Sequence, residues 1–326
     1  MNIYKKRISL LLVGVVLAGV VALTGCASPQ KSQEGKESLT VAYQYGLAYA
    51  PLTIMQELQL IESNYDGEIE IEWLNLNSGS AINEGVLTGE IDVANMGVGP
   101  FVTGVTAGIP YKMYATISAQ PHKLMSNNPD IQSLEDIKPE HKIALVNIGS
   151  IQHILLSMQA EKELADAHAL DENIVAMSHP DGMVALLSGS VDCQLTTAPY
   201  IYEEMESEGI HEIAGLEEVW PEGSAFIVGL VSDDLYENRP ELYDAVVAAT
   251  QEAIVYMNEN PEHAAEIVAS KQDYKKEDVL KWITSEGCVY DSHLDGVMRM
   301  ADFMAQHGFV EKAPDGIEAI TTPSAR

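Results

Sequence analysis

Five short segments combine small residues with hydroxyl, amide and phenol groups, which suits them to binding a small polar molecule. They are YGLAYAP at 45–51, NLNSGS at 75–80, GVGP at 97–100, NIGS at 147–150 and TTAPY at 196–200. Glycine, serine and threonine leave backbone N–H groups and hydroxyls accessible to an anion or a polar head group, and tyrosine adds flat walls. Any one of these residues could instead serve only to build a turn or a helix cap. The same composition in five segments favours binding.

We therefore predict that the ligand contacts come from these segments. The predicted contact residues are Tyr45, Gly46, Tyr49, Ser78, Gly79, Ser80, Gly97, Gly99, Asn147, Gly149, Ser150, Thr196, Thr197 and Tyr200.

The sequence contains no set of residues typical of catalysis or metal binding. The nine histidines never occur at i, i+4 spacing or clustered with cysteine, as a zinc site would require. A nucleophile elbow, a phosphate-binding loop and a Cys-His pair in a catalytic context are also absent. His122 and His179 each adjoin a proline in a predicted loop, where a surface role is the simpler interpretation and ligand contact the alternative. The sequence therefore indicates a protein that binds its ligand without catalysis and without a metal or cofactor.

The five segments need elements that bring them together, and the hydropathy pattern predicts alternating strands and helices. Strands are expected at 39–44, 69–74, 91–95, 112–118, 142–146, 174–177, 192–195 and 225–231, with helical stretches such as 52–61 between them. This alternation is typical of α/β proteins with mixed, mostly parallel sheets. In such proteins ligands bind beyond the carboxyl ends of the strands. Strict alternation at 68–73 predicts a strand with one solvated face, away from the centre of its sheet.

An internal repeat predicts two similar lobes. The segment LTGEIDV at 87–93 reappears as LSGSVDC at 187–193, and each copy leads to a proline. Chance similarity of two helix-to-strand junctions is the alternative. We predict lobe I from 39–123 plus 220–326 and lobe II from 124–219, with the ligand cleft between them. From Pro240 onward everything is predicted to be helical, at 242–258, 261–269, 276–285 and 294–306, and to cover lobe I.

The N-terminus has the layout of a signal peptide at 1–25. Three basic residues precede an apolar run at 8–23, which is too short to span a bilayer of about 30 Å as a helix. The run ends in Leu-Thr-Gly-Cys, which resembles the lipobox of bacterial lipoproteins, and this resemblance implies acylation (palmitate) of Cys26. An ordinary cleaved signal peptide is the alternative. Residues 26–38 are polar and predict a flexible tether.

The net charge and the cysteines limit the classes of molecule that this chain is expected to bind. Cleavage before Cys26 leaves 15 basic and 49 acidic residues, a formal charge of −34. Nucleic acid and anionic lipid are therefore excluded as natural partners. Cys193 and Cys288 have no recognisable metal or pairing pattern. We expect two buried thiols, and a disulfide between them is the alternative.

Four segments resemble the nitrate/sulfonate/taurine/bicarbonate-type solute-binding proteins of ABC importers: GLAYAPL at 46–52, GSAIN at 79–83, GEIDVA at 89–94 and GVGP at 97–100. The resemblance implies a two-lobed type II periplasmic-binding-protein fold that closes on a small molecule and delivers it to permease subunits. It implies a sulfonate, small oxyanion, aromatic acid or pyrimidine-type ligand, and it places Gln120 near the hinge. No arginine lies between Arg7 and Arg239, so a charged ligand would depend on helix dipoles and N–H groups.

Two other functions stay open at this point. The same fold resembles that of thiamine-pyrimidine synthases and some menaquinone-pathway enzymes, but those work in the cytosol, which the signal peptide opposes. A subunit that senses ligand for a membrane receptor is the second alternative. We expect a monomer anchored by lipid to the extracytoplasmic face of the cell membrane, in the periplasm or at the cell surface.

Overall fold

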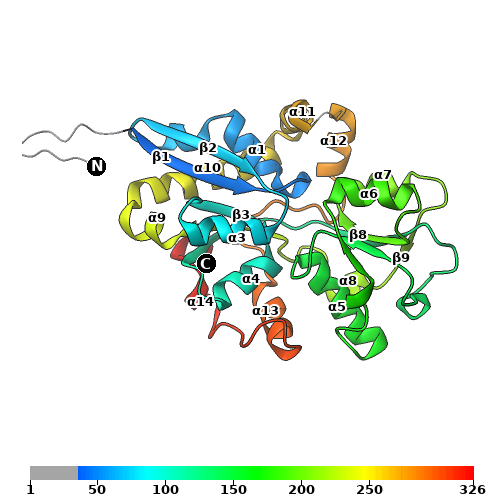
Figure 1. Ribbon diagram of the computed structural model, residues 1–326. Coiled ribbons are helices and arrows are strands. Elements are labelled where there is room, and N and C mark those ends of the chain that lie inside the picture. The colour runs from blue at the N-terminus through cyan, green and yellow to red at the C-terminus, as the bar shows by residue number, and fades with distance from the viewer. Residues whose placement is uncertain (1–35, 273) are drawn as a thin grey trace, which may run out of the picture. The chain divides into compact units, whose positions relative to one another are not determined.

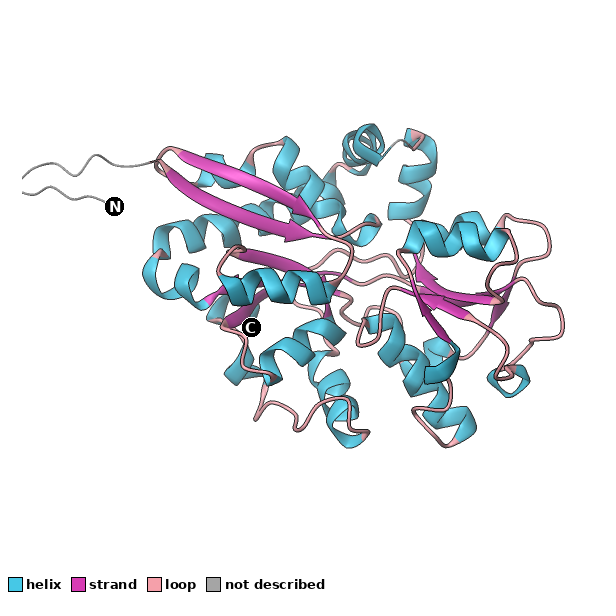
Figure 2. Ribbon diagram, in the orientation of Figure 1, coloured by secondary structure: helices cyan, strands magenta, loops and turns pink. Residues whose placement is uncertain are grey.

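The computed structural model describes residues 36–272 and 274–326, which contain two β-sheets, each flanked by helices (Figure 2). The predicted signal peptide and the lipidation site Cys26 lie outside these residues. Strand β1 begins at Glu37, within the segment expected to be a tether. In the described part, no helix is long and apolar enough to cross a membrane.

The first sheet has the strand order β2-β1-β3-β10-β4 (Figure 1). Strand β1 pairs in parallel with β2 and β3, and β10 pairs antiparallel with β3 and β4. Strand β2 lies at the edge and alternates between half-buried and exposed residues, so the predicted solvated face is confirmed. The strands are β1 (Glu37–Tyr43), β2 (Ile69–Asn75), β3 (Val93–Gly97), β4 (Tyr111–Ser118) and β10 (Ile227–Ser232).

The second sheet has the order β7-β6-β8-β5-β9. Its strands are β5 (His122–Ser126), β6 (Ile143–Leu145), β7 (Ile174–Ala176), β8 (Cys193–Thr197) and β9 (His211–Ile213). Here β6 pairs in parallel with β7 and β8, while β5 pairs antiparallel with β8 and β9. Each sheet is therefore mixed, with as many antiparallel as parallel pairings among the described strands. The predicted α/β class with mixed sheets is confirmed, but the expectation that the sheets are mostly parallel is wrong, because the strands next to the crossovers, β5 and β10, pair antiparallel with both of their neighbours.

Helices connect the strands and cover the sheets. The first sheet carries α1 (Ala50–Glu57), α2 (Leu60–Asn64), α3 (Gly79–Thr88) and α4 (Val98–Thr106). The second carries α5 (Ile151–Leu164), α6 (His179–Leu187), α7 (Tyr200–Met205) and α8 (Leu216–Val219). The C-terminal part forms α9 (Asp233–Asn238), α10 (Pro240–Glu259), α11 (Pro261–Gln272), α12 (Lys276–Ile283), α13 (Val297–Gln306) and α14 (Ile317–Ile320).

The prediction that everything after Pro240 is helical is wrong for residues 284–296 and 307–316. Gly287 and Gly296 have φ values of 81° and 119°, which a right-handed helix cannot accommodate. Within the first of these segments, Val289 pairs with Ala119 as a short antiparallel bridge. The segment therefore lies against the first crossover between the sheets.

The two copies of the repeat have the same local structure. Gly89 and Gly189, with φ values of 77° and 73°, follow the ends of α3 and α6. The carboxylate of Asp92 accepts a 2.8 Å hydrogen bond from the N–H of Thr40, and that of Asp192 accepts one of 2.8 Å from the N–H of Lys142. Asp92 thus holds the start of β3 against β1, and Asp192 holds the start of β8 against the start of β6, the parallel neighbour in each case.

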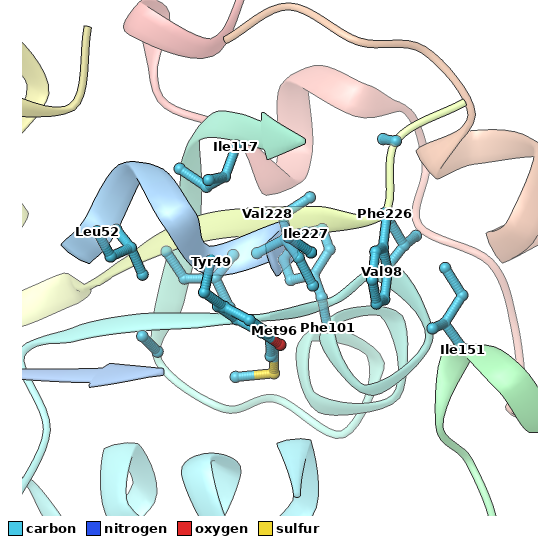
Figure 3. Packing of buried hydrophobic residues seen from close by; sticks show 14 of the residues in the cluster. Tyr49, Leu52, Met96, Val98, Phe101, Ile117, Ile151, Phe226, Ile227 and Val228 are labelled. Atoms are coloured by element: carbon cyan, nitrogen blue, oxygen red, sulfur yellow. The ribbon is translucent and has the colours of Figure 1, made fainter. Parts of the chain in front are cut away.

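The chain crosses between the sheets at residues 119–121 and 220–226. The two crossovers are adjacent, because the N–H of Phe226 donates to the carbonyl of Ser118 at 2.8 Å. The strands of the first sheet come from 37–118 and 227–232, and those of the second from 122–213. This supports the proposed lobes, 39–123 with 220–326 and 124–219. In Figure 3, Ile151 of α5 lies beside Val98 and Phe226, so apolar packing continues from one sheet to the other.

Candidate ligand-binding site

A small cavity, called the inner cavity here, lies where loops from both sheets meet. Its volume is about 30 Å³, enough for only one or a few water molecules. Its lining residues follow the carboxyl ends of strands or begin helices. The loops of the first sheet contribute Gln44, Tyr45, Tyr49, Asn77, Gly79, Gly97, Pro100 and Phe226, and those of the second contribute Val146, Asn147, Ser150, Ile151, Gln152, Ser178 and His179.

The loops on the two sides are in contact, so the structure is a closed arrangement. The side-chain amide of Asn147 donates to Ser80 Oγ at 3.2 Å. Gly99 lies against the backbone of residues 149–151, where an added Cβ would be 3.0 Å from the nitrogen of Ile151 and 3.1 Å from the carbonyl oxygen of Gly149. A side chain at this position would require the backbones to move apart by a few tenths of an ångström, so glycine suits this close approach.

Four helices begin at the inner cavity, two from each sheet: α3, α4, α5 and α6. Serine side chains cap three of them, since Ser78, Ser150 and Ser178 accept hydrogen bonds from backbone N–H groups three residues later. The first N–H groups of a helix have no partner within it and carry a partial positive charge. The cavity is therefore surrounded by groups that attract an anion.

Acidic residues are missing from three of these four helix starts. The first turns of α3, α4 and α5 contain none, whereas the first turns of α9, α10, α11 and α12 all contain at least one. In α6 the first turn holds Asp181, which is exposed and bonded to Ser178. In a chain with 49 acidic residues, this distribution leaves the N-terminal partial charges at the cavity largely uncompensated.

Among the described residues that line the inner cavity, none has a charged side chain at neutral pH. Burial lowers the pKa of His179 to about 4. Burial, and secondarily the nearby His179, lowers the pKa of His122 to about 3. His179 Nδ1 lies 2.9 Å from the hydroxyl of Thr196, and its ring stacks on Tyr200 with centroids 5.6 Å apart. Both imidazoles are therefore neutral, and attraction for an anion comes from dipoles and N–H groups.

Gln152, in the first turn of α5, presents an unsatisfied amide to this cavity. Its side chain is only 2% exposed, and its Nε2 has no hydrogen-bond partner among the described residues. Gln159, two turns later on the same helix, is equally buried, but its Nε2 donates to Glu163 at 2.8 Å and to the carbonyl of Ala214 at 2.9 Å. A buried donor without a partner is costly, so Gln152 marks a position where a ligand acceptor atom would be stabilised.

His153 holds the loop before α5 in place. Its Nδ1 accepts a 3.0 Å hydrogen bond from the N–H of Gly149, and its Nε2 donates to Asp171 at 3.0 Å. The ring is buried, and burial lowers its pKa despite the Asp171 carboxylate, which acts in the opposite direction. This pairing fixes the loop that meets Gly99 and Ser80 across the cavity.

A second and larger cavity, called the outer chamber, adjoins the first and shares Gln44, Tyr45 and Tyr49 with it. Its volume is about 530 Å³. Its one lysine, Lys271, forms an ion pair with Glu57 at 2.7 Å. The other lining residues are Tyr43, Gly46, Thr53, Gln56, Asn75, Pro180, Tyr200, Gln272 and Tyr274.

Eleven of the fifteen predicted residues fall into three groups at or between the cavities. Six line the inner cavity: Tyr45, Tyr49, Gly79, Gly97, Asn147 and Ser150. Gly46 and Tyr200 line the outer chamber. Ser80, Gly99 and Gly149 form the contact between the two sides.

The other four predicted residues have structural partners instead of facing either cavity. Ser78 caps α3, and Thr196 bonds to His179. Thr197 Oγ1 donates to the carbonyl of Pro121 at 3.0 Å, at the first crossover. Gln120 lies there too, where its amide donates to the hydroxyl of Tyr290 at 3.2 Å and accepts a bond from Cys288.

Several lining residues were not predicted. Gln44 adjoins the predicted segment 45–51, and Asn77 lies within the predicted segment 75–80. Phe226 was assigned to a strand, and Gln152 reads as an ordinary polar residue in a helix. Cys193 and Cys288 are both free thiols, and no cluster that could hold a metal ion occurs in 36–272 or 274–326.

Comparison with known proteins agrees with this geometry. Residues 32–270 match the model of the NMT1-like family. A Bacillus subtilis (strain 168) protein named "Putative aliphatic sulfonates-binding protein" is 24% identical over 306 residues, covering 92% of this chain and 90% of its own.

Solved structures show the same fold. The alkanesulfonate-binding protein of Xanthomonas axonopodis, bound to MOPS, is similar with a TM-score of 0.69 at 16% identity, covering 89% of this chain and 99% of its own. The periplasmic aliphatic sulphonate-binding protein of Escherichia coli has a TM-score of 0.66 at 19% identity, covering 89% and 93%. The two-lobed periplasmic-binding-protein fold is therefore confirmed.

Proposed function

This chain belongs to the NMT1-like family, and we propose on that basis that it is the solute-binding component of an ABC importer. Its role would be to capture a small molecule outside the cytoplasm and to release it to the permease subunits. Three of the proteins that it resembles are named for sulfonate binding, and another, from Synechocystis PCC 6803, is named for nitrate binding. Binding and release require no chemical step, which agrees with the uncharged residues around the inner cavity.

We propose that the ligand is a small, singly charged anion, with sulfonates the first class to test. The observation that carries this proposal is the meeting of four helix N-termini at one cavity, three of them without an acidic residue in the first turn. These termini stabilise negative charge without a basic side chain. A doubly charged ligand would gain less, because no lysine or arginine lines the inner cavity to balance the second charge.

Ligand entry requires the two sides to separate. The inner cavity of about 30 Å³ is too small for a sulfonate group to enter while Gly99 touches residues 149–151. The crossovers at 119–121 and 220–226 are the only covalent links between the sheets within the described residues. We infer that they act as the hinge and that ligand binding shifts the population toward the closed arrangement.

Membrane attachment is the remaining part of the proposal. Lipidation of Cys26 would hold the protein at the extracytoplasmic face of the membrane, close to its permease. Replacement of Cys26 by serine is expected to release the protein from the membrane fraction of the expressing cells. Retention of the Cys26→Ser protein in that fraction would contradict the lipid anchor.

The ligand proposal can be tested by thermal unfolding and calorimetry of the chain from Ala27 onward. The panel would contain methanesulfonate, ethanesulfonate, nitrate, bicarbonate, sulfate, aromatic acids and pyrimidines. A true ligand at a hundred times its dissociation constant stabilises the folded state by about 2.7 kcal/mol. We expect stabilisation by sulfonates and none by sulfate. Stabilisation by a neutral pyrimidine and by no anion would overturn the assignment of an anionic ligand.

A further inference from the structure

We propose that the bound anion carries a flat aromatic tail that occupies the outer chamber, which makes the preferred ligand an arylsulfonate. This inference rests on the proposed function, because it assumes that the anionic group lies at the helix N-termini of the inner cavity. It goes beyond the relatives, whose names refer to aliphatic sulfonates or alkanesulfonates.

The size of the two cavities separates head from tail. The inner cavity, of about 30 Å³, leaves no space beyond a head group. The outer chamber offers about 530 Å³ and adjoins the inner cavity, because Gln44, Tyr45 and Tyr49 line both. Any ligand larger than its head group must therefore extend into the outer chamber, so the walls of that chamber select the tail.

Five of the thirteen residues that line the outer chamber are tyrosines, and they come from both sheets. Tyr43 and Tyr49 lie next to each other at the end of β1, with ring centroids 6.5 Å apart. On the other side, Tyr200 of α7 stacks on His179, which itself lines the inner cavity. Aromatic rings thus continue from the head-group site into the chamber. Flat rings prefer to stack or meet edge to face, so this wall suits an aromatic tail better than a flexible alkyl chain.

Tyr45 is the clearest sign of an absent partner. Its side chain lines both cavities and is 46% exposed, and it is the only aromatic residue among the large exposed apolar residues of the described part. No hydrogen bond or ring contact holds it within 36–272 or 274–326. A solvent-exposed ring at the junction of the two cavities is explained if a ligand ring covers it.

The chamber also excludes a charged tail. Lys271 is paired with Glu57, so no unpaired charged side chain is present among the lining residues described. A tail with an ammonium or a second anionic group would lose hydration without gaining a counter-charge. The tail is therefore uncharged as well as flat.

The test uses three ligands with the same head group and different tails, namely methanesulfonate, butane-1-sulfonate and benzenesulfonate. Dissociation constants would be measured by calorimetry on the chain from Ala27 onward. We expect benzenesulfonate to bind about tenfold more tightly than butane-1-sulfonate, since ring contacts add to the apolar area buried. In the Tyr45→Ala variant the affinity for benzenesulfonate should fall about tenfold more than the affinity for methanesulfonate.

Tyr236→Ala is the matched control, because Tyr236 packs against Tyr243 and Lys112 and lines neither cavity. It should leave all three affinities unchanged. Equal binding of butane-1-sulfonate and benzenesulfonate, with equal losses in Tyr45→Ala, would overturn the aromatic tail while the proposed function stands. Failure of all three sulfonates to bind would overturn the proposed function itself.

Discussion

The unsatisfied amide of Gln152 leads to a prediction in which stability and affinity change in opposite directions. Replacement by leucine removes a buried donor that has no hydrogen-bond partner among the described residues. The Gln152→Leu protein should therefore be more stable than the wild type without ligand. It should also bind sulfonate less tightly, because the acceptor oxygen of the bound anion loses its hydrogen bond.

The magnitudes follow from the burial of this side chain, which is 2% exposed. An unpaired buried polar group costs about 1–3 kcal/mol, and leucine is slightly larger than glutamine, which offsets part of the gain, so we expect a net gain of about 1 kcal/mol in the free energy of unfolding. For a chain of this size that gain raises the melting temperature by about 2 °C. A hydrogen bond to a charged acceptor contributes about 1.5–3 kcal/mol. The dissociation constant should therefore rise about ten- to a hundredfold.

Gln159 provides the control, since it lies on the same helix, is equally buried and has two partners for its Nε2, although its Oε1 has none among the described residues. Gln159→Leu should lower the melting temperature of the ligand-free protein, with little change in affinity. Urea unfolding and calorimetry of both variants would measure the four quantities. A less stable Gln152→Leu protein with unchanged affinity would show that Gln152 has a structural role, and the assignment of this residue to the ligand would be refuted.

Two further predictions concern closure and pH. Gly99→Ala should weaken ligand binding about tenfold, because the added methyl group would meet the backbone of residues 149–151 when the two sides close; full affinity with an unaltered scattering profile on ligand addition would contradict this. Burial raises the pKa of the Glu204 carboxyl to about 8, so the folded state keeps a proton that the unfolded state loses above its ordinary pKa of 4.5. The free energy of unfolding should therefore fall as pH rises between these two values, by at most about 1.4 kcal/mol per pH unit. Urea unfolding at pH 5 and pH 8 should show this fall in the wild type and not in Glu204→Gln. An equal fall in the wild type and the variant would exclude Glu204 as its source.

The strands that alternate with helices along the chain could be predicted, because the hydropathy pattern of neighbouring residues shows which of their side chains are buried. The strand at 69–74 has an alternating pattern and is found at Ile69–Asn75. The strand expected at 91–95 lies at Val93–Gly97, because Asp92 is held by Thr40 before the ladder begins. Strands β5 and β9 carry few apolar residues and owe their place to pairing with each other and with β8. Such pairing partners, distant in sequence, leave no local pattern.

The candidate site could likewise be predicted only in part. The place where the two sides meet could be predicted from the segments of glycine, serine and tyrosine, because helix N-termini have a local sequence pattern. Gln152 could not be predicted, since the residues that line the cavity with it are distant in sequence. Gln120 and Thr197 are polar for a different reason: they bond to Tyr290 and to the carbonyl of Pro121 beside the crossovers. A polar residue in a loop does not reveal from its sequence whether it contacts ligand or hinge.

The position of β10 has a consequence for the order in which the protein folds. This strand lies between β3 and β4, yet it follows both of them in the chain, after the whole of the second sheet. Strand β4 therefore has no neighbour in its own sheet until residues 227–232 are available, whereas residues 122–213 contain every strand of the second sheet. Contacts between distant residues form slowly, so we expect the second sheet to assemble as the chain emerges and the first to remain open. For that interval β3 and β4 both present unpaired edges, and a newly exported chain is most exposed to aggregation there.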